Sequence, residues 1–347
     1  MSYTRRDFGK LALAAVPAAQ ALAAINSKFK GVQIGAITYS FGQTPAAEII
    51  PALATIGIGE VELMSNHCEA LAGAPAMPSF GRGRGPGGPP PAAASGQAAP
   101  PAAAAGEPGR GGRGGRFQMT PEQQEAMRKA QEEVKKWRMS TTPDTFKAVR
   151  KKFDDAGIDL HILCFNQGMN ATDDEIEYAF QMAKALDVKA ISSSSTVSFA
   201  KRVAPFAEKH KMIWAGHGHD NVADPEQFAT PKSFETIMSY SKYIWVNLDI
   251  GHFTAAGFDA VAYVKQIHDR ISNLHLKDRK KPVDGGGRPA NLPWGQGDTP
   301  IKEVLNLMAK EKYKFPANIE LEYQVPEGSD RVTEMKKCLQ YCKDALA

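Results

Sequence analysis

Residues 211–278 read KMIWAGHGHDNVADPEQFATPKSFETIMSYSKYIWVNLDIGHFTAAGFDAVAYVKQIHDRISNLHLKD. Two kinds of segment alternate in this stretch. Runs rich in β-branched and aromatic residues predict strands at 211–217, 244–249 and 271–276, and helical periodicity predicts helices at 231–240 and 258–269. Strands that alternate with helices form a parallel sheet, because each helix carries the chain back to the edge where the previous strand began. This part of the chain is therefore predicted to be α/β.

The same alternation extends towards both ends of the chain. The other predicted strands cover 32–39, 59–64, 158–165, 188–193 and 317–323, and the other predicted helices cover 45–56, 143–156, 173–186, 199–210, 301–310 and 331–345. Eight strand–helix units in about 250 residues close as a (β/α)8 TIM barrel. The alternative is an open, doubly wound sheet, but no Gly-rich phosphate loop follows the first strand, as that fold would favour.

Side chains that can bind a metal follow each of the last four predicted strands. They are His217 and His219, Asp249 and His252, His275 and Lys277, and Glu320 and Glu322. The carboxyl ends of barrel strands surround one mouth, so one His, one Asp, a second His and one Glu can reach a single ion. Two nitrogens and two carboxylates suit Mn²⁺, Co²⁺, Zn²⁺ or Fe²⁺ better than Ca²⁺, which prefers oxygen ligands alone.

The motifs at these strand ends resemble those of the xylose-isomerase-like barrel superfamily, the sugar phosphate isomerases/epimerases. The resemblance covers residues 31–345 apart from an insertion. It rests on the order of the eight units and on four motifs, Asp249-x-Gly251-His252, His275-x-Lys277-Asp278, Gly295-Gln296-Gly297-Asp298 and Glu320-x-Glu322-Tyr323. In that family the metal is bound by Glu, Asp, His and Glu from the last four strands.

The resemblance implies one divalent metal ion, Mn²⁺ in preference to Co²⁺, Zn²⁺, Fe²⁺ or Mg²⁺. The implied ligands are His217, Asp249, His275 and Glu322, with Glu320 as the alternative to Glu322. The first ligand departs from the family pattern, since His217-Gly218-His219 stands where many members have Glu-Asn-His. Metal binding survives this change, but the pair of glutamates that flanks the sugar in the family is incomplete.

The resemblance further implies a metal-dependent carbohydrate isomerase or epimerase with a small-molecule carbohydrate as substrate. A carbonyl bound to a divalent ion makes the adjacent C–H acidic and stabilises the enediolate, and a nearby carboxylate removes the proton. The candidate catalytic residues are Glu322, Glu320, Lys277 and Glu62. The candidate substrate-binding residues are His219, His252, Trp294, His67 and Asn166, with Trp294 expected to stack on a sugar ring.

Three other functions are compatible with a barrel of this kind. A lyase that eliminates the aglycone from a 3-keto-glycoside would use the same metal site. A non-catalytic periplasmic sugar-binding barrel is compatible with the altered first ligand. An endonuclease-IV-like phosphodiesterase is disfavoured, because it requires more His and Glu at the strand ends and a basic face.

The first 23 residues have the three parts of an export signal. Thr4-Arg5-Arg6-Asp7-Phe8-Gly9-Lys10 is basic, 11–16 is apolar, and Ala21-Leu22-Ala23 offers small residues for cleavage. The paired arginines resemble a twin-arginine signal. We therefore expect residues 1–23 to be recognised by the twin-arginine export machinery and the protein to reach the bacterial periplasm. The apolar run is too short to span a bilayer, so no stable membrane insertion is expected.

A low-complexity insertion separates the second and third strands of the predicted single domain, 24–347. Residues 72–116 hold 13 Gly, 9 Pro and five Arg against one acid, Glu107, and are expected to be disordered. A charged helix is expected at 120–138. The insertion carries a charge of +4 and the signal peptide +2, so the net charge of +4 leaves the barrel slightly acidic. No nucleic-acid partner is therefore expected.

Overall fold

The computed structural model describes residues 24–78 and 119–347 of the chain. The predicted signal peptide and residues 79–116 of the predicted disordered insertion lie outside the described residues. Export by the twin-arginine machinery and a periplasmic location therefore stay predictions. In the two described ranges, no helix is long and apolar enough to cross a membrane.

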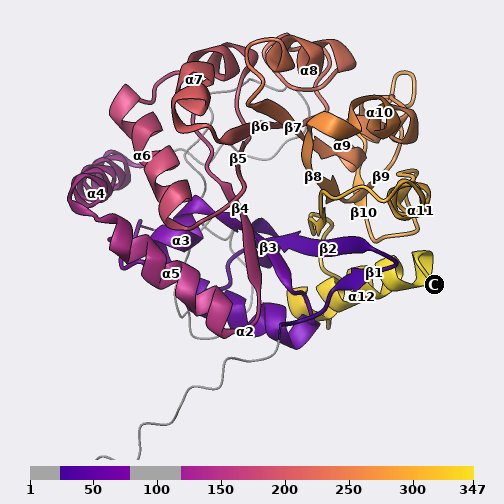
Figure 1. Cartoon of the computed structure of the whole chain (residues 1–347), viewed down its shortest axis with the longest axis horizontal. Coiled ribbons are helices and arrows are strands. Elements are labelled where there is room, and N and C mark those ends of the chain that lie inside the picture. The colour runs from indigo at the N-terminus through magenta and orange to yellow at the C-terminus, as the bar shows by residue number, and fades with distance from the viewer. Residues whose placement is uncertain (1–23, 79–118) are drawn as a thin grey trace, which may run out of the picture.

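Eight parallel strands form a closed barrel at the centre of the molecule (Figure 1). They are β2 (Val32–Ile37), β3 (Glu60–Met64), β4 (Asp159–Cys164), β5 (Ala190–Ser193), β6 (Ile213–His217), β7 (Ile244–Asp249), β8 (Ile271–Leu276) and β11 (Ala317–Ile319). Each strand pairs with the next in the chain, and β2 pairs with both β3 and β11, which closes the barrel. The short β1 (Lys28–Phe29) adds antiparallel to β2. The predicted TIM barrel is confirmed.

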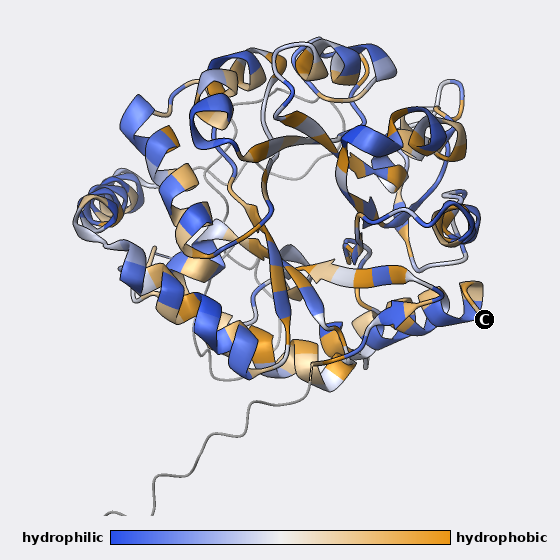
Figure 2. Cartoon of the chain, viewed as in Figure 1, coloured by the Kyte–Doolittle hydropathy of each residue, from blue (hydrophilic) through white to orange (hydrophobic). Residues whose placement is uncertain are grey.

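A ring of helices covers the outside of the barrel. The ring consists of α2 (Ala46–Ile56), α5 (Pro143–Asp155), α6 (Asp173–Ala185), α7 (Val197–His210), α8 (Pro231–Met238), α10 (Ala260–Ile267), α11 (Ile301–Glu311) and α12 (Arg331–Ala345). Their polar faces point outward and their apolar faces pack on the strands (Figure 2). In α6, for example, Ile176 and Phe180 are buried, and Thr172 caps the helix by accepting a hydrogen bond from the Glu175 amide.

Several short elements at the strand ends were not expected from the sequence. A 3-10 helix, η1 (Thr38–Phe41), replaces the end of the first predicted strand, and a second one, η2 (His268–Arg270), follows α10. Two short helices, α3 (Ser65–Leu71) and α9 (Ile250–Ala255), directly follow β3 and β7. A two-stranded hairpin joins β9 (Asp278–Arg279) to β10 (Asn291–Leu292).

The prediction that the last strand extends to residue 323 is wrong, because β11 ends at Ile319. Beyond that point the Leu321 amide donates to Ser40 Oγ, at 3.0 Å, instead of to a neighbouring strand. Glu320 and Glu322 therefore lie on the segment after the strand rather than within it.

The charged helix α4 (Pro121–Ser140) lies outside the ring, next to α5 and α6 (Figure 1). It begins at the predicted position, where Thr120 and Gln123 form a capping box. Near its end, Arg138 donates two hydrogen bonds to Glu69 of α3, at 2.7 and 2.9 Å, and Tyr178 donates a third to the same carboxylate at 3.0 Å. The C-terminal end of α4 is thus anchored to the barrel beside β3.

Candidate active site

The polar side chains inside the barrel form two layers, set by the two-residue period of the strands. In β7, β8 and the β11 segment, Asn247, Asn273 and Asn318 each stand two residues before a candidate ligand, namely Asp249, His275 and Glu320. Residues two apart point to the same side of a strand, so each amide lies below its candidate ligand. We refer to these three asparagines as the amide layer.

The amide layer holds the carboxylate of Glu62, which points into the barrel from β3 and is fully buried. Its oxygens accept hydrogen bonds from Asn273 Nδ2 at 2.7 Å, Asn247 Nδ2 at 3.2 Å, Asn318 Nδ2 at 3.2 Å and Ser192 Oγ. A buried carboxylate is costly unless its oxygens are satisfied, and these donors satisfy both. Glu62 is therefore held in a fixed position below the mouth of the barrel, and its carboxylate does not project into the pocket.

His275 connects the amide layer and its bound Glu62 to the candidate ligands at the mouth. Its Nε2 lies 2.6 Å from Glu62 Oε2, and its Nδ1 lies 3.0 Å from Glu320 Oε2. Burial alone would lower the pKa of His275, but the two carboxylates outweigh it and hold that pKa well above its usual value. Nε2 is directed to Glu62 and Nδ1 to Glu320 at the mouth, so Nδ1 is the nitrogen that could bind a metal ion once it has lost its proton.

Four buried side chains at the mouth form a cluster that could hold a metal ion. One ligand atom from each of His217, Asp249, His275 and Glu320 lies within 4.8 Å of the others. His217 Nδ1 is a buried atom without a hydrogen-bond partner among the described residues, and the buried Asp249 Oδ2 has the Lys277 ammonium at 2.9 Å but accepts no hydrogen bond from it. Unsatisfied buried donors and acceptors of this kind, with two imidazoles and two carboxylates, fit a divalent metal ion. The structure brings Glu320, rather than Glu322, together with the other three.

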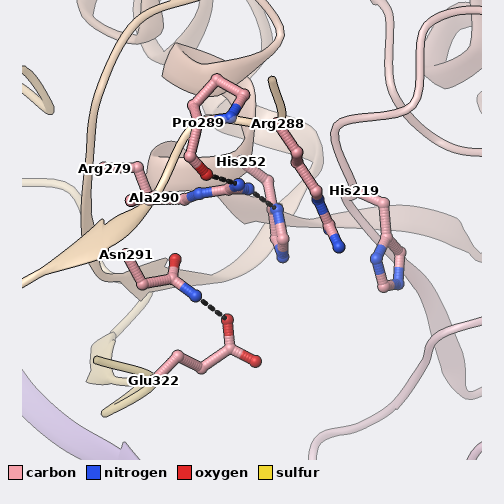
Figure 3. A pocket seen from close by; sticks show the side chains of 8 residues that line it. All are labelled: His219, His252, Arg279, Arg288, Pro289, Ala290, Asn291 and Glu322. Carbon is pink, nitrogen blue, oxygen red and sulfur yellow. Dashed lines mark hydrogen bonds between the residues drawn. The ribbon is translucent and has the colours of Figure 1, made fainter. Parts of the chain in front are cut away.

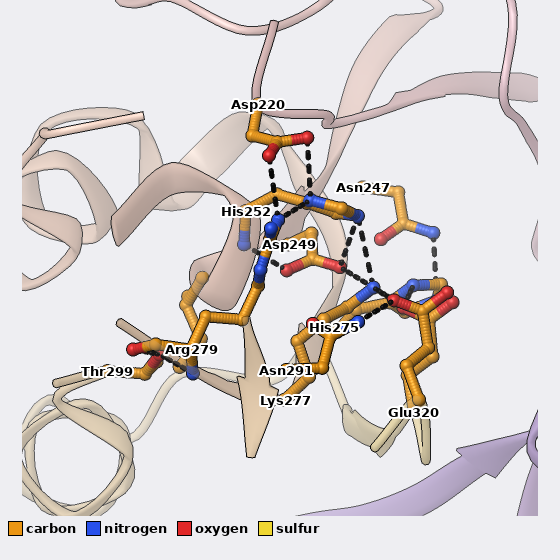
Figure 4. A network of polar contacts seen from close by, with 12 residues as sticks. Asp220, Asn247, Asp249, His252, His275, Lys277, Arg279, Asn291, Thr299 and Glu320 are labelled. Atoms are coloured by element: carbon orange, nitrogen blue, oxygen red, sulfur yellow. Dashed lines mark hydrogen bonds and ion pairs between the residues drawn. The ribbon is translucent and has the colours of Figure 1, made fainter. Parts of the chain in front are cut away.

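The Asp249-x-Gly251-His252 motif builds one wall of the site through a short helix. Asp249 Oδ1 accepts the His252 amide at 2.7 Å and so caps α9 at the end of β7. A Cβ at position 251 would lie 2.3 Å from Lys277 Cγ, so only glycine lets these segments meet. The helix in turn directs the His252 ring to the mouth (Figure 4).

Lys277 lies among the acidic groups of the mouth. Its Nζ is 2.9 Å from Asp249 Oδ2, 2.8 Å from Glu320 Oε2 and 2.6 Å from Glu322 Oε2. Burial would lower the pKa of Lys277, but the three carboxylates outweigh it and raise that pKa, so the amine is an ammonium ion at neutral pH. A protonated amine is not a nucleophile, which argues against covalent catalysis by this lysine.

A pocket of about 340 Å³ opens next to this cluster (Figure 3). It is lined by His219, His252, Arg279, Arg288, Pro289, Ala290, Asn291 and Glu322. Glu322 is its only lining carboxylate among the described residues, and its Oε2 lies 3.4 Å from Asn291 Nδ2. Burial lowers the pKa of His219 to about 4, so this imidazole is neutral at pH 7. The pocket thus combines a carboxylate, two guanidinium groups and two imidazoles whose pKa values are lowered by burial, and all of them can form hydrogen bonds with hydroxyl groups.

A charged cluster in the wall of the pocket was missed by the sequence analysis. Asp220 lies 3.0 Å from an Arg279 nitrogen, 3.3 Å from His252 Nδ1, and accepts two hydrogen bonds from Arg288 at 2.6 and 2.9 Å. Burial would raise the pKa of Asp220, but these donors hold it well below its usual value. The amide layer was missed as well, although the two-residue spacing between each asparagine and the following candidate ligand could have revealed it.

Three predicted substrate-binding residues lie away from this pocket. His67 is buried in α3 with its Nδ1 2.9 Å from Thr38 Oγ1, and Asn166 accepts the Ser194 amide at 2.8 Å. Trp294 lines a second pocket and packs edge-on against Tyr341, with ring centroids 5.7 Å apart. The predicted residues His219 and His252 do line the first pocket.

Asp278 connects the motif His275-x-Lys277-Asp278 to the motif Gly295-Gln296-Gly297-Asp298. Its carboxylate accepts the amides of Gly295 and Gly297, both at 2.8 Å, and that of Thr299 at 3.2 Å. A Cβ at position 297 would lie 2.0 Å from Asp278 Oδ1. The second glycine of Gly295-Gln296-Gly297 is therefore required by the close approach of this carboxylate.

We expect Asp278→Asn to lower the free energy of unfolding by about 1–3 kcal/mol, because one side-chain oxygen cannot accept three amides. Hydrogen exchange should accelerate at residues 295–299. Chemical denaturation and exchange mass spectrometry measure both effects, and Asp284→Asn, in an exposed position of the same loop region, is the matched control. Unchanged exchange at 295–299 in Asp278→Asn would contradict this role.

A sequence model described as "Xylose isomerase-like TIM barrel" matches residues 122–344, so the chain belongs to this family. Among characterised proteins, it is similar to inosose dehydratases from Mesomycoplasma hyopneumoniae. The protein of strain J is 25% identical over 155 residues, which are 41% of this chain and 51% of that protein. The protein of strain 7448 is 24% identical over the same shares. The match thus spans about half the length of these relatives.

Solved structures share the fold at low sequence identity. The IOLI protein, whose crystal structure has a binding zinc atom, aligns with a TM-score of 0.55 and 11% identity over 90% of this chain and 98% of that chain. The probable 3-DHS dehydratase AsbF from Bacillus anthracis gives 0.54 and 12% over 89% and 97%. A sugar phosphate isomerase/epimerase from Parabacteroides distasonis gives 0.52 and 16% over 92% and 96%. At these identities the likeness concerns the fold alone.

Proposed function

We propose that the protein is a metal-dependent carbohydrate isomerase or epimerase that removes a proton next to a substrate carbonyl. The observation that carries this proposal is the position of Glu322, a pocket-lining carboxylate directly beside the buried cluster of His217, Asp249, His275 and Glu320. A divalent ion held by that cluster would polarise a carbonyl and a neighbouring hydroxyl of the substrate. The proposed metal is Mn²⁺, in preference to Co²⁺, Zn²⁺ or Fe²⁺, which the two imidazoles and two carboxylates also suit.

In this proposal Glu322 is the general base. Its side chain is about one fifth exposed, in contrast to the buried Glu320, so it can meet a substrate in the pocket. Lys277 and Asn291 lie at its Oε2 and orient the carboxylate. Returning the proton to the neighbouring carbon from the same side requires no second base, and this favours isomerisation. Epimerisation would need a protonated group on the opposite face to return the proton, and the lowered pKa values of His219 and His252 disfavour an imidazolium there.

A second candidate is a lyase, and the similarity to the inosose dehydratases favours it. The same proton removal becomes an elimination when a leaving group stands at the β carbon. Water leaves in a dehydratase, and the aglycone leaves from a 3-keto-glycoside. The residues of the site are the same for both outcomes, so the product distinguishes them.

The proposal is tested by incubating the Mn²⁺-loaded protein with pools of free sugars and keto-glycosides in D₂O. We expect deuterium to enter the carbon next to the carbonyl, and mass spectrometry detects it. Retention of all substituents indicates an isomerase or epimerase, and loss of water or an aglycone indicates a lyase. Treatment with a chelator should abolish exchange and renewed Mn²⁺ should restore it. Exchange that persists after chelation, or its absence from every substrate, would refute the metal-dependent mechanism.

A further inference from the structure

Lys277 and the candidate metal ligands use the same carboxylate oxygens. The side chain is 2% exposed, and its ammonium lies 2.9 Å from Asp249 Oδ2 and 2.8 Å from Glu320 Oε2. Both carboxylates belong to the cluster that could hold a metal ion. In this arrangement the positive charge that balances the two buried carboxylates comes from the chain itself (Figure 4).

The position of the Lys277 ammonium between these carboxylates follows from the backbone around it. Lys277 directly follows β8 and stands two residues after His275, so both side chains point to the same side, into the barrel. Its stem passes over Gly251, where a Cβ would lie 2.3 Å from Lys277 Cγ and 2.6 Å from its carbonyl oxygen. The close packing of the lysine stem on Gly251 therefore fixes the path of the side chain into the buried cluster.

An ammonium and a divalent ion cannot both be held by these oxygens at low cost. Like charges that close together repel strongly in a buried site, where water does not screen them. Asp249 is held by the His252 amide at its Oδ1, and Glu320 is held by His275 Nδ1 at 3.0 Å. A lysine side chain, in contrast, has four rotatable bonds and a compact charge. The lysine is therefore the group that can move.

Glu322 can keep the Lys277 ammonium paired outside the metal cluster. Glu322 Oε2 lies 2.6 Å from Lys277 Nζ, and Glu322 lines the pocket but does not belong to the metal cluster. Asn291 Nδ2 lies 3.4 Å from the same oxygen and marks the pocket side of the carboxylate. A rotation of the lysine stem about its contact with Glu322 moves the charge out of the cluster without leaving it unpaired.

We propose that Lys277 is an exchangeable counter-ion, which a divalent metal displaces from Asp249 and Glu320 into the pocket. There the ammonium stays paired with Glu322 and donates to an oxygen of the substrate. This inference deepens the proposed function and rests on its metal site. It makes binding ordered, since the substrate contact of Lys277 forms only after the metal has entered. It also makes Lys277 a competitor that weakens metal binding.

Calorimetric titration with Mn²⁺, without substrate, tests the competition. Lys277→Met keeps the stem and removes the charge, and we expect it to bind Mn²⁺ about tenfold more tightly than the unaltered protein, or more. Lys265→Met, at an exposed position of α10, is the control and should not change the affinity. Equal or weaker Mn²⁺ binding by Lys277→Met overturns the exchange. Binding by neither protein overturns the metal site itself.

Amine labelling of the unaltered protein tests the movement and needs no variant. Reductive methylation followed by peptide mapping should modify Lys277 several-fold faster with saturating Mn²⁺ than with a chelator, while labelling of Lys265 stays the same. Equal labelling of Lys277 under both conditions overturns the displacement. Neither readout requires turnover, so an inactive protein that shows tighter binding and faster labelling would refute the proposed function and support the exchange.

Discussion

Replacing His275 by Ala is expected to remove both bound metal and turnover. His275 is buried at the centre of the site, and its Nδ1 faces the cluster while its Nε2 is held by Glu62 at 2.6 Å. Deleting the ring removes one candidate ligand and leaves the Glu62 carboxylate with only the uncharged donors of the amide layer and Ser192. A metal ion contributes several kcal/mol to charge stabilisation, and each 1.36 kcal/mol corresponds to a factor of ten, so we expect turnover to fall by about 10³-fold or more.

Metal content after dialysis and deuterium exchange of the substrate measure the two losses. His268→Ala is the control, because His268 is exposed and stacks only on Tyr313, with ring centroids 4.8 Å apart. It should keep metal content and turnover near those of the unaltered protein. A His275→Ala protein that is folded, metal-free and still active would exclude a metal-dependent mechanism.

Glu62→Gln is expected to weaken metal binding by about 10–100-fold although Glu62 is not a candidate ligand. A carboxylate only accepts hydrogen bonds, and all its partners here are donors. The amide nitrogen of glutamine would face one of those donors, so either an asparagine of the amide layer or His275 must turn away. The loss of at least one buried hydrogen bond should also lower the free energy of unfolding by about 1–3 kcal/mol.

Glu60→Gln is the matched control for this variant. Glu60 lies two residues earlier in the same strand and is also buried, and burial raises its pKa well above the usual value. Burial thus favours the uncharged form of this carboxyl group, which glutamine resembles in charge and size. Titration with Mn²⁺ and chemical denaturation should therefore separate the two variants. Equal Mn²⁺ affinities in Glu62→Gln and Glu60→Gln would show that Glu62 does not position His275.

The barrel could be predicted because its signal is periodic and repeated. Eight apolar runs separated by amphipathic segments leave few alternatives to a closed parallel barrel, and the polar groups after four successive strands locate its mouth. The short helices α3 and α9 could not be predicted in this way. Each has fewer than eight residues, so hydrophobic periodicity does not reveal it, and α9 depends on a cap that Asp249 supplies from the strand end.

The choice between Glu320 and Glu322 illustrates a second limit of the sequence. Side chains two apart reach the same side, and period alone cannot separate them. In the structure both glutamates lie beyond the end of β11 and both contact the Lys277 ammonium, but Glu320 is buried in the cluster whereas Glu322 is about one fifth exposed. Asp220 and Arg279 were missed for a related reason, since their ion pair joins the segment after β6 to β9 and no local pattern connects these two segments.

The spread of the candidate ligands over the chain has a consequence for the assembly of the barrel. His217 comes from the fifth barrel strand in chain order and Glu320 from the segment after the eighth, so the cluster does not exist until the last unit has docked. β11 is also the strand that pairs with β2 and completes the circle. A folding intermediate without this final pairing would lack Glu320 at its place in the cluster, even if the other helices and strands had formed. Tight metal binding by this cluster would therefore require the closed barrel, and it would report on closure as well as on chemistry.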